Sequence, residues 1–132
     1  MTENEIGTSI VETAINIHRE LGPGLLESVY EIAMAHQLQQ RGLSVERQAP
    51  IPIEYQGHRF DEGFRADLIV ESKVIVELKC VDQLNNAHKK QLLTYLRLTG
   101  FRLGYLLNFS EALMKQGITR TVNKLAELGN NI

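Results

Sequence analysis

The chain has 132 residues, of which 43% are hydrophobic and 23% charged, a balance typical of one soluble folded domain. The formal net charge of −2 weighs against a protein that binds nucleic acid through an overall basic surface, and the single cysteine excludes an internal disulfide bond. Because the first twenty residues carry acids and no apolar run is long enough to span a bilayer, we expect no signal peptide, no membrane segment and a cytoplasmic location for a single domain over residues 1–132.

The first helix is predicted from the amino terminus to residue 21. Thr2 and Glu5 have the spacing of a capping box, in which each side chain accepts a hydrogen bond from the other residue's backbone N–H. Apolar side chains then recur every three or four residues, as they do on one face of a helix. The sequence Gly22-Pro23-Gly24 is a strong helix breaker, so the helix should end there.

A second helix is predicted over residues 25–41, with Gly42 at its carboxyl end. The apolar residues of this segment again recur at helical spacing, which indicates one buried face. We expect four side chains on that face: Leu26, Val29, Tyr30 and Ala33.

Three strands should follow, because alternating apolar and polar residues replace the helical spacing. They are expected at residues 43–55, 58–70 and 74–81, joined by turns at residues 56–57 and 71–73. Two prolines, Pro50 and Pro52, lie in the first of these strands. Because proline cannot donate a ladder hydrogen bond, that strand should lie at an edge of the sheet.

The remaining elements are a helix over residues 85–99, capped by Gly100, and an apolar strand over residues 101–108. Ser110 is expected to cap a short helix, and residues 118–122 are a candidate strand before a fraying tail. The order α-α-β-β-β-α-β predicts an α/β domain with a mixed central sheet flanked by helices. Its strand–helix–strand crossover should be right-handed and should make the two strands that it joins parallel.

Charged residues interrupt the third strand, VIVELKC, near its carboxyl end. The strand begins with apolar residues that should be buried, whereas Glu77 and Lys79 share one of its faces. If the preceding turn consists of residues 71–73, Asp67 lies opposite Glu77, with about 4.5–5.5 Å between the Cβ atoms. A two-residue turn would instead place it opposite Leu78. In the first register two carboxylates repel each other, so a positive charge is needed beside them.

Two interpretations of this cluster remain open from the spacing alone. In the first, Asp67 and Glu77 bind a divalent cation such as Mg²⁺, which proteins commonly hold with one or two carboxylates, water and phosphate oxygens. Lys79 would then orient a water molecule or stabilise the negative charge that develops on a phosphate. In the second, Lys79 only neutralises the acids in a cross-strand salt bridge on a solvated face.

The helix predicted over residues 85–99 carries polar side chains that can reach the same region. His88, Gln91 and Tyr95 are spaced by three and four residues and therefore share one face. That face is either solvated or in contact with the charged cluster. Between residues 79 and 102 there are five Lys or Arg residues and one acid, which is weak support for a contact with phosphate groups.

Three segments of this sequence match family motifs. Asp67, followed ten residues later by Glu77-Leu78-Lys79 within this order of elements, resembles the motif of the PD-(D/E)xK nuclease superfamily. The run Gln91-Leu92-Leu93-Thr94-Tyr95 is similar to the Q-x-x-x-Y motif of the RecB-like branch, and Gly24-Leu25-Leu26-Glu27-Ser28-Val29-Tyr30 resembles the signature of the small bacterial GxxExxY proteins. The resemblance covers about residues 5–125, with one departure: Ala66 stands before Asp67, where the motif has proline.

The resemblance implies a restriction-endonuclease-like core and a nuclease that depends on Mg²⁺ or Mn²⁺. Asp67 and Glu77 would be the metal ligands, Lys79 the catalytic lysine and Glu27 an accessory acid near the metal. The alternative is a catalytically silent module of the same fold that binds nucleic acid or a protein partner.

The expected substrate is nucleic acid, with DNA favoured. The small size of the chain also leads us to expect that a homodimer or another partner supplies specificity. Five residues on the helix after the third strand are candidates for substrate binding: Gln91, Tyr95, His88, Lys89 and Lys90.

Overall fold

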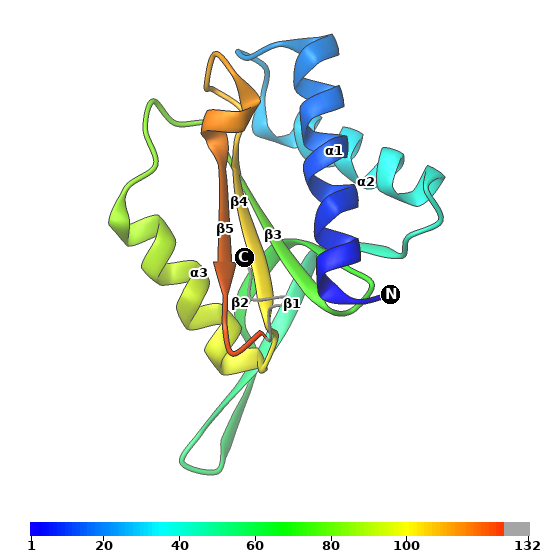
Figure 1. Ribbon diagram of the computed structural model, residues 1–132. Coiled ribbons are helices and arrows are strands. Elements are labelled where there is room, and N and C mark those ends of the chain that lie inside the picture. The colour runs from blue at the N-terminus through cyan, green and yellow to red at the C-terminus, as the bar shows by residue number, and fades with distance from the viewer. Residues whose placement is uncertain (126–132) are drawn as a thin grey trace.

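A five-stranded sheet with helices on both sides forms the structure, a computed structural model that describes residues 1–125. The helices are α1 (Glu3–Leu21), α2 (Glu27–Gln40) and α3 (Asn86–Thr99), with a short 3₁₀ helix, η1 (Met114–Gly117). The strands are β1 (Val45–Tyr55), β2 (His58–Val70), β3 (Val74–Lys79), β4 (Leu103–Asn108) and β5 (Ile118–Val122). Helices α1 and α2 lie on one side of the sheet and α3 on the other (Figure 1), so the predicted α/β class is confirmed.

The strands follow one another across the sheet in sequence order, from β1 to β5. Strands β3 and β4, which α3 connects, are parallel, and every other neighbouring pair is antiparallel. The sheet is therefore mixed, as predicted. Strand β1, which contains Pro50 and Pro52, forms one edge, and β5 forms the other at the residues proposed for it. The β1–β2 hairpin extends beyond the rest of the sheet (Figure 1).

Two apolar clusters cover the two faces of the sheet. The larger joins α1 and α2 to the strands and includes Tyr30 and Leu78, whereas the smaller packs Leu92 and Leu96 of α3 on Ile75. Strand β3 is thus covered on both faces, which explains its apolar start. Within residues 1–125 none of the helices combines the length and apolarity that a membrane crossing requires.

The predicted helix ends are confirmed where a side chain or glycine defines them. Thr2 and Glu5 form the expected capping box of α1, with hydrogen bonds of 2.8 and 3.2 Å. Helix α3 ends at Gly100, whose φ of 77° lies in the left-handed region that glycine adopts without steric cost.

Helix α2 buries only part of the predicted face. It begins at Glu27, two residues later than expected, so Leu26 precedes the helix and is 74% exposed. Val29 is also exposed. Tyr30 is fully buried as predicted and Ala33 is partly buried. Met34 and Leu38 are fully buried too, because their spacing of four residues from Tyr30 follows the stripe that packs on the sheet. The prediction was thus wrong for Leu26 and Val29.

The predicted Ser110-capped helix was also wrong. The 3₁₀ helix η1 begins at Met114, and its preceding residue, Leu113, makes no side-chain cap. Ser110 has a different role because its backbone N donates a hydrogen bond of 3.3 Å to Asn108 Oδ1, which organises the turn after β4. Residues 126–132 of the predicted fraying tail lie outside the described residues.

Candidate functional site

Strands β2 and β3 bring Asp67 and Glu77 opposite each other, in the register that a turn over residues 71–73 imposes. The backbone pairing of β2 with β3 ends at Leu68 and Val76, and beyond it a gap opens that the two carboxylates bridge. Glu77 Oε2 accepts a hydrogen bond of 2.8 Å from Asp67 N, and Asp67 Oδ2 accepts one of 2.8 Å from Leu78 N. Each carboxylate is therefore fixed by the backbone of the opposite strand, in the gap between the two.

A kink in the β1–β2 hairpin accompanies this gap. In β1, Val45 packs on the larger apolar cluster but Ala49, four residues on, belongs to the smaller one, although a regular strand would place both on one face. Gln48 lies between them with a φ of 49°, in the left-handed region. The side chains of β2 change face at Asp67 in the same way. The kink thus interrupts the regular alternation of faces at Asp67.

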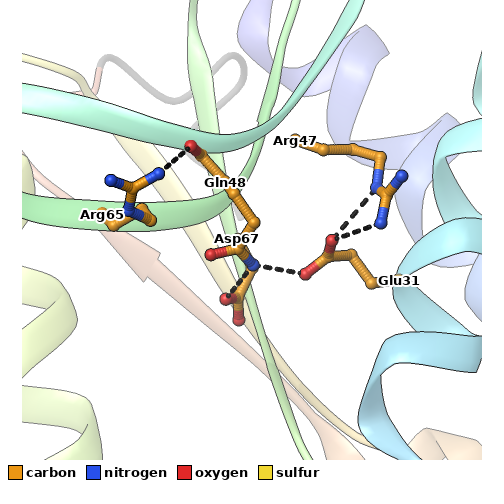
Figure 2. Close-up of polar contacts among 5 residues, drawn as sticks. All are labelled: Glu31, Arg47, Gln48, Arg65 and Asp67. Carbon is orange, nitrogen blue, oxygen red and sulfur yellow. Dashed lines mark hydrogen bonds and ion pairs between the residues drawn. The ribbon is translucent and has the colours of Figure 1, made fainter.

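The Gln48 side chain links Asp67 to helix α2 (Figure 2). Its Nε2 donates hydrogen bonds to Asp67 Oδ1 at 3.2 Å and to Glu31 Oε1 at 2.6 Å. Glu31 is only 7% exposed, and Arg47 neutralises it with two contacts of 3.0 Å to Oε2. Arg65 donates a hydrogen bond of 3.2 Å to Gln48 O, which holds the kinked backbone. Together these residues fix the orientation of the Asp67 carboxylate.

Negative charge accumulates at this site. Burial raises the pKa of Glu77 to about 8, and the charge of Asp67 adds to this effect, whereas the hydrogen bond from Asp67 N and the charge of Lys79 oppose it. Burial also raises the pKa of Asp67, although its hydrogen bonds from Leu78 and Gln48 lower it. Burial and repulsion by neighbouring carboxylates thus disfavour the charged form of both carboxyl groups, and the charge of Lys79 offsets this only in part.

Glu27 and Lys79 complete the cluster from two different elements. Partial burial and the charge of Asp67 raise the pKa of Glu27, while Lys79 and a hydrogen bond from Cys80 N lower it. Lys79 is half-buried at the end of β3 and pairs with Asn108 of β4. The structure therefore brings together the four predicted catalytic residues.

Asn108 fixes the chain directly after Lys79. The Asn108 side chain is fully buried, donates a hydrogen bond of 2.9 Å to Val81 O and accepts one of 3.2 Å from Val81 N. Because these two bonds hold the end of β3 against β4, they limit where the Lys79 side chain can go.

Helix α3 contributes Tyr95 and Gln91 from the opposite layer. The Tyr95 ring stacks on Phe64, with 3.6 Å between the ring centroids. Burial raises the pKa of Tyr95, the charges of Glu77 and Asp67 add to this effect, and a hydrogen bond with Gln91 lowers it. The site is therefore bordered by both helical layers.

The other three candidates on α3 are not brought to the acids. His88 takes part in the capping box at the start of α3, where its Nδ1 accepts a hydrogen bond of 3.3 Å from Asn85 N. Lys89 and Lys90 are exposed. Their roles in substrate binding remain predictions.

Three residues of the site were not predicted from the sequence: Glu31, Gln48 and Asn108. Glu31 could have been found, because it lies four residues after Glu27 and shares its helix face. Gln48 and Asn108 carry no such signal, since their roles depend on neighbouring strands that are distant in sequence.

Tyr30 fixes the loop that precedes Glu27. Its hydroxyl donates a hydrogen bond of 2.6 Å to Gly22 O and accepts one of 3.1 Å from Leu25 N. The ring is fully buried and stacks on Phe109, with 4.4 Å between the centroids. The tyrosine at the end of the GLLESVY segment thus determines where α2 begins and so where Glu27 lies.

Replacing Tyr30 by Phe should lower the free energy of unfolding by about 1–2 kcal/mol, because Gly22 O and Leu25 N each lose a partly buried partner. Chemical denaturation measures this loss. The control is Tyr55→Phe, since Tyr55 is 64% exposed and should tolerate the same change. Equal stabilities of the two variants would contradict the proposed role of the Tyr30 hydroxyl.

The residues present fit a divalent cation held mainly by two carboxylates. Within residues 1–125 no three His, Cys, Asp or Glu side chains form a ready metal site. Asp67 and Glu77 nevertheless supply hard oxygen ligands, which suit Mg²⁺ and Mn²⁺. Among the described residues no hydrogen bond is found to Glu77 Oε1. A cation would compensate the carboxylate charge that burial and Asp67 both disfavour, the two effects that raise the pKa of Glu77. Such an ion would keep positions for water and phosphate.

Comparisons with known proteins agree with this geometry. A family model described as the PD-(D/E)XK nuclease superfamily matches residues 4–121. The crystal structure of SSO0001 has a similar fold, with a TM-score of 0.54 and 20% sequence identity. The match covers 76% of this chain and 52% of that one, so this chain spans about half the length of that protein. No curated protein matches the sequence.

Proposed function

Because the chain belongs to the PD-(D/E)XK nuclease superfamily, we propose that it is a Mg²⁺- or Mn²⁺-dependent nuclease that hydrolyses phosphodiester bonds of nucleic acid. One observation supports this function above the others. Asp67 and Glu77 are held opposite each other in a gap of the sheet, with Lys79 and Glu27 close enough for their charges to interact. Burial and the charge of Asp67 raise the pKa of Glu77 to about 8, and strongly perturbed carboxyl groups of this kind are common at functional sites.

In this proposal each residue of the cluster has a distinct task. Asp67 and Glu77 would hold the metal, which supplies a Lewis acid at the phosphate and lowers the pKa of bound water. The Lys79 ammonium group stabilises negative charge that develops on the phosphate oxygens. Glu27 accepts a proton from the attacking water, because a carboxylate with a raised pKa is a better base near neutral pH. Gln91 contacts the bound strand.

Calorimetric titration with Mg²⁺ and Mn²⁺, together with cleavage assays on single- and double-stranded DNA and RNA, tests this function. We expect wild type to bind the metal and to cut nucleic acid, with DNA favoured. Wild type that binds no metal and cuts no substrate would contradict the proposal. Wild type that binds nucleic acid without cutting it would support the silent-module alternative. Light scattering of the same sample tests for the expected homodimer.

Replacing Lys79 by Ala should reduce the cleavage rate by about 10²–10³, as typically follows loss of one group that stabilises transition-state charge. Metal binding should persist, because Asp67 and Glu77 are retained. The matched control is Lys115→Ala, which removes an exposed lysine of η1. If Lys79→Ala cleaves as fast as this control, the catalytic role of Lys79 is wrong.

A further inference from the structure

A polar pocket lies where α3 ends, β4 begins and β5 ends. It has a volume of about 380 Å³. Its lining combines three basic side chains with a glycine and an asparagine: Arg97, Arg102, Lys124, Gly100 and Asn123. All three cations are exposed at the surface. The pocket shares no lining residue with the acidic site described above.

Hydrogen bonds fix the three segments that form this pocket. Asn123 Nδ2 donates to Phe101 O at 3.0 Å and to Leu96 O at 3.3 Å, and Asn123 N donates to Arg102 O at 2.9 Å. Gly100 N also bonds Leu96 O at 2.9 Å. The end of α3 is therefore joined to both strands, and the positions of the three cations relative to one another are restricted.

Stabilisation of the carboxyl end of α3 does not explain all three cations. A basic residue in the last turn, here Arg97, is commonly favoured by the helix dipole. The carbonyl of Leu96, however, already accepts bonds from Gly100 N, Asn123 Nδ2 and the Thr99 hydroxyl. Arg102 and Lys124 lie outside the helix. Helix capping therefore accounts for one cation of the three.

The charge distribution along the chain also indicates an anionic ligand. Residues 83–110 contain four Lys or Arg residues and no acid, whereas the rest of the chain contains 10 Lys or Arg and 16 Asp or Glu. Within residues 1–125 the ion pairs involve other cations, which are Arg41, Arg47, Arg59 and Arg65. The positive charge of the pocket is thus not neutralised by the described part of the protein.

We propose that this pocket binds a backbone phosphate of the nucleic acid at a distance from the bond that is cut. The inference rests on the proposed nuclease function. The two sites lie on the α3 side of the sheet, since Arg97 is on α3 and Glu77 shares the face of Ile75. Arg102 precedes the residue paired with Val74, so the separation along β3 is at least about 10 Å. A stacked strand advances about 3.4 Å per nucleotide, so at least about three nucleotides separate the two phosphates.

The double variant R97Q/R102Q tests this proposal through the salt dependence of binding. The probe is a fluorescein-labelled single-stranded oligonucleotide of about 16 nucleotides, long enough to span both sites, in EDTA so that no cleavage occurs. Loss of one phosphate contact reduces the slope of log K against log salt by about 0.7 for single strands, so we expect a reduction of about 0.7. The affinity deficit of the variant should therefore shrink about 2.6-fold between about 50 and 200 mM salt.

The matched control is R19Q/K115Q. Arg19 and Lys115 also line a pocket, of about 420 Å³, but it lies beside α1 and η1. The control removes the same charge and should keep the wild-type slope. Arg102→Lys should restore most of the affinity that Arg102→Gln loses, and thermal unfolding of each variant shows that it is folded.

The outcomes separate this proposal from the nuclease proposal. If oligonucleotide binding depends on Arg97 and Arg102 but the protein cuts nothing, the result supports phosphate binding at the pocket and contradicts nuclease activity. If wild type cleaves nucleic acid and R97Q/R102Q binds it with unchanged salt dependence, the phosphate-binding proposal is wrong and the nuclease proposal stands. An equal loss of slope in R19Q/K115Q, or no oligonucleotide binding at all, also overturns the phosphate-binding proposal. Pyrophosphate that binds to the pocket without displacing the oligonucleotide would show a site for free anions and overturn it as well.

Discussion

Replacing Glu77 by Gln should abolish detectable Mg²⁺ binding and cleavage while making the metal-free protein increasingly more stable than wild type as the pH rises from about 4.5 to 8. The loss of affinity should exceed the 10–100-fold that typically follows removal of a group that only supports a ligand. The amide oxygen can still accept the hydrogen bond from Asp67 N, so the gap between β2 and β3 is retained. Stability rises because the buried carboxylate and its repulsion by Asp67 are both removed.

Calorimetry with Mg²⁺ and thermal unfolding in EDTA measure the two effects of this substitution. At about pH 8 the variant should exceed wild type by more than about 1 kcal/mol in unfolding free energy, and at about pH 4 the two should be nearly equal. The control is Glu20→Gln, an exposed acid on α1, which should change neither property. A variant that loses metal binding but is less stable than wild type at both pH values would show that Glu77 stabilises the fold.

The main geometry of the site could be predicted from the sequence because it depends on local spacing. Turn residues 71–73 set the register of a hairpin, and the register then places Asp67 beside Glu77. The strand–helix–strand order required β4 to run parallel to β3. Capping residues defined the ends of α1 and α3 for the same reason, since each cap involves residues close in sequence.

The features that were not predicted depend on packing between distant segments. Gln48 adopts a positive φ and reaches both Glu31 and Asp67, a contact that exists only once α2 packs beside β1 and β2. Spacing could also not decide whether Leu26 lies inside α2, because Leu26 and Tyr30 are four residues apart and both apolar. Leu26 precedes the helix and is exposed, whereas Tyr30 is buried and its hydroxyl bonds the preceding loop.

The site is therefore assembled on two kinds of support. Asp67 and Glu77 are held by strand backbone, which places them rigidly. Glu27 is held by the start of α2, whose position depends on the Tyr30 hydroxyl. Substitutions in the loop between α1 and α2 should consequently move Glu27 and leave Asp67 and Glu77 in place.

The affinity for Mg²⁺ should rise by up to about tenfold per pH unit between about pH 5 and 8 and then level off. A carboxylate must lose its proton to bind a cation, and the pKa of Glu77 in the metal-free protein is about 8. The raised pKa of Asp67 adds to this dependence on pH. Calorimetry at about pH 7, in two buffers that differ in ionisation enthalpy, should show release of about one proton per bound ion, and at about pH 9 almost none.

The stability of the metal-free protein should change with pH in the opposite direction. Between the ordinary pKa of 4.5 and the folded value of about 8, the folded chain retains a proton on Glu77 that the unfolded chain has lost. The folded state thus binds more protons, so this group makes the free energy of unfolding fall as pH rises, by up to about 1.4 kcal/mol per pH unit. Since bound metal compensates the carboxylate charge, the Tm difference between metal-bound and metal-free protein should widen over the same range. A difference that stays constant from about pH 5 to 8 would mean that Glu77 is not a metal ligand, because its proton would then not compete with the ion.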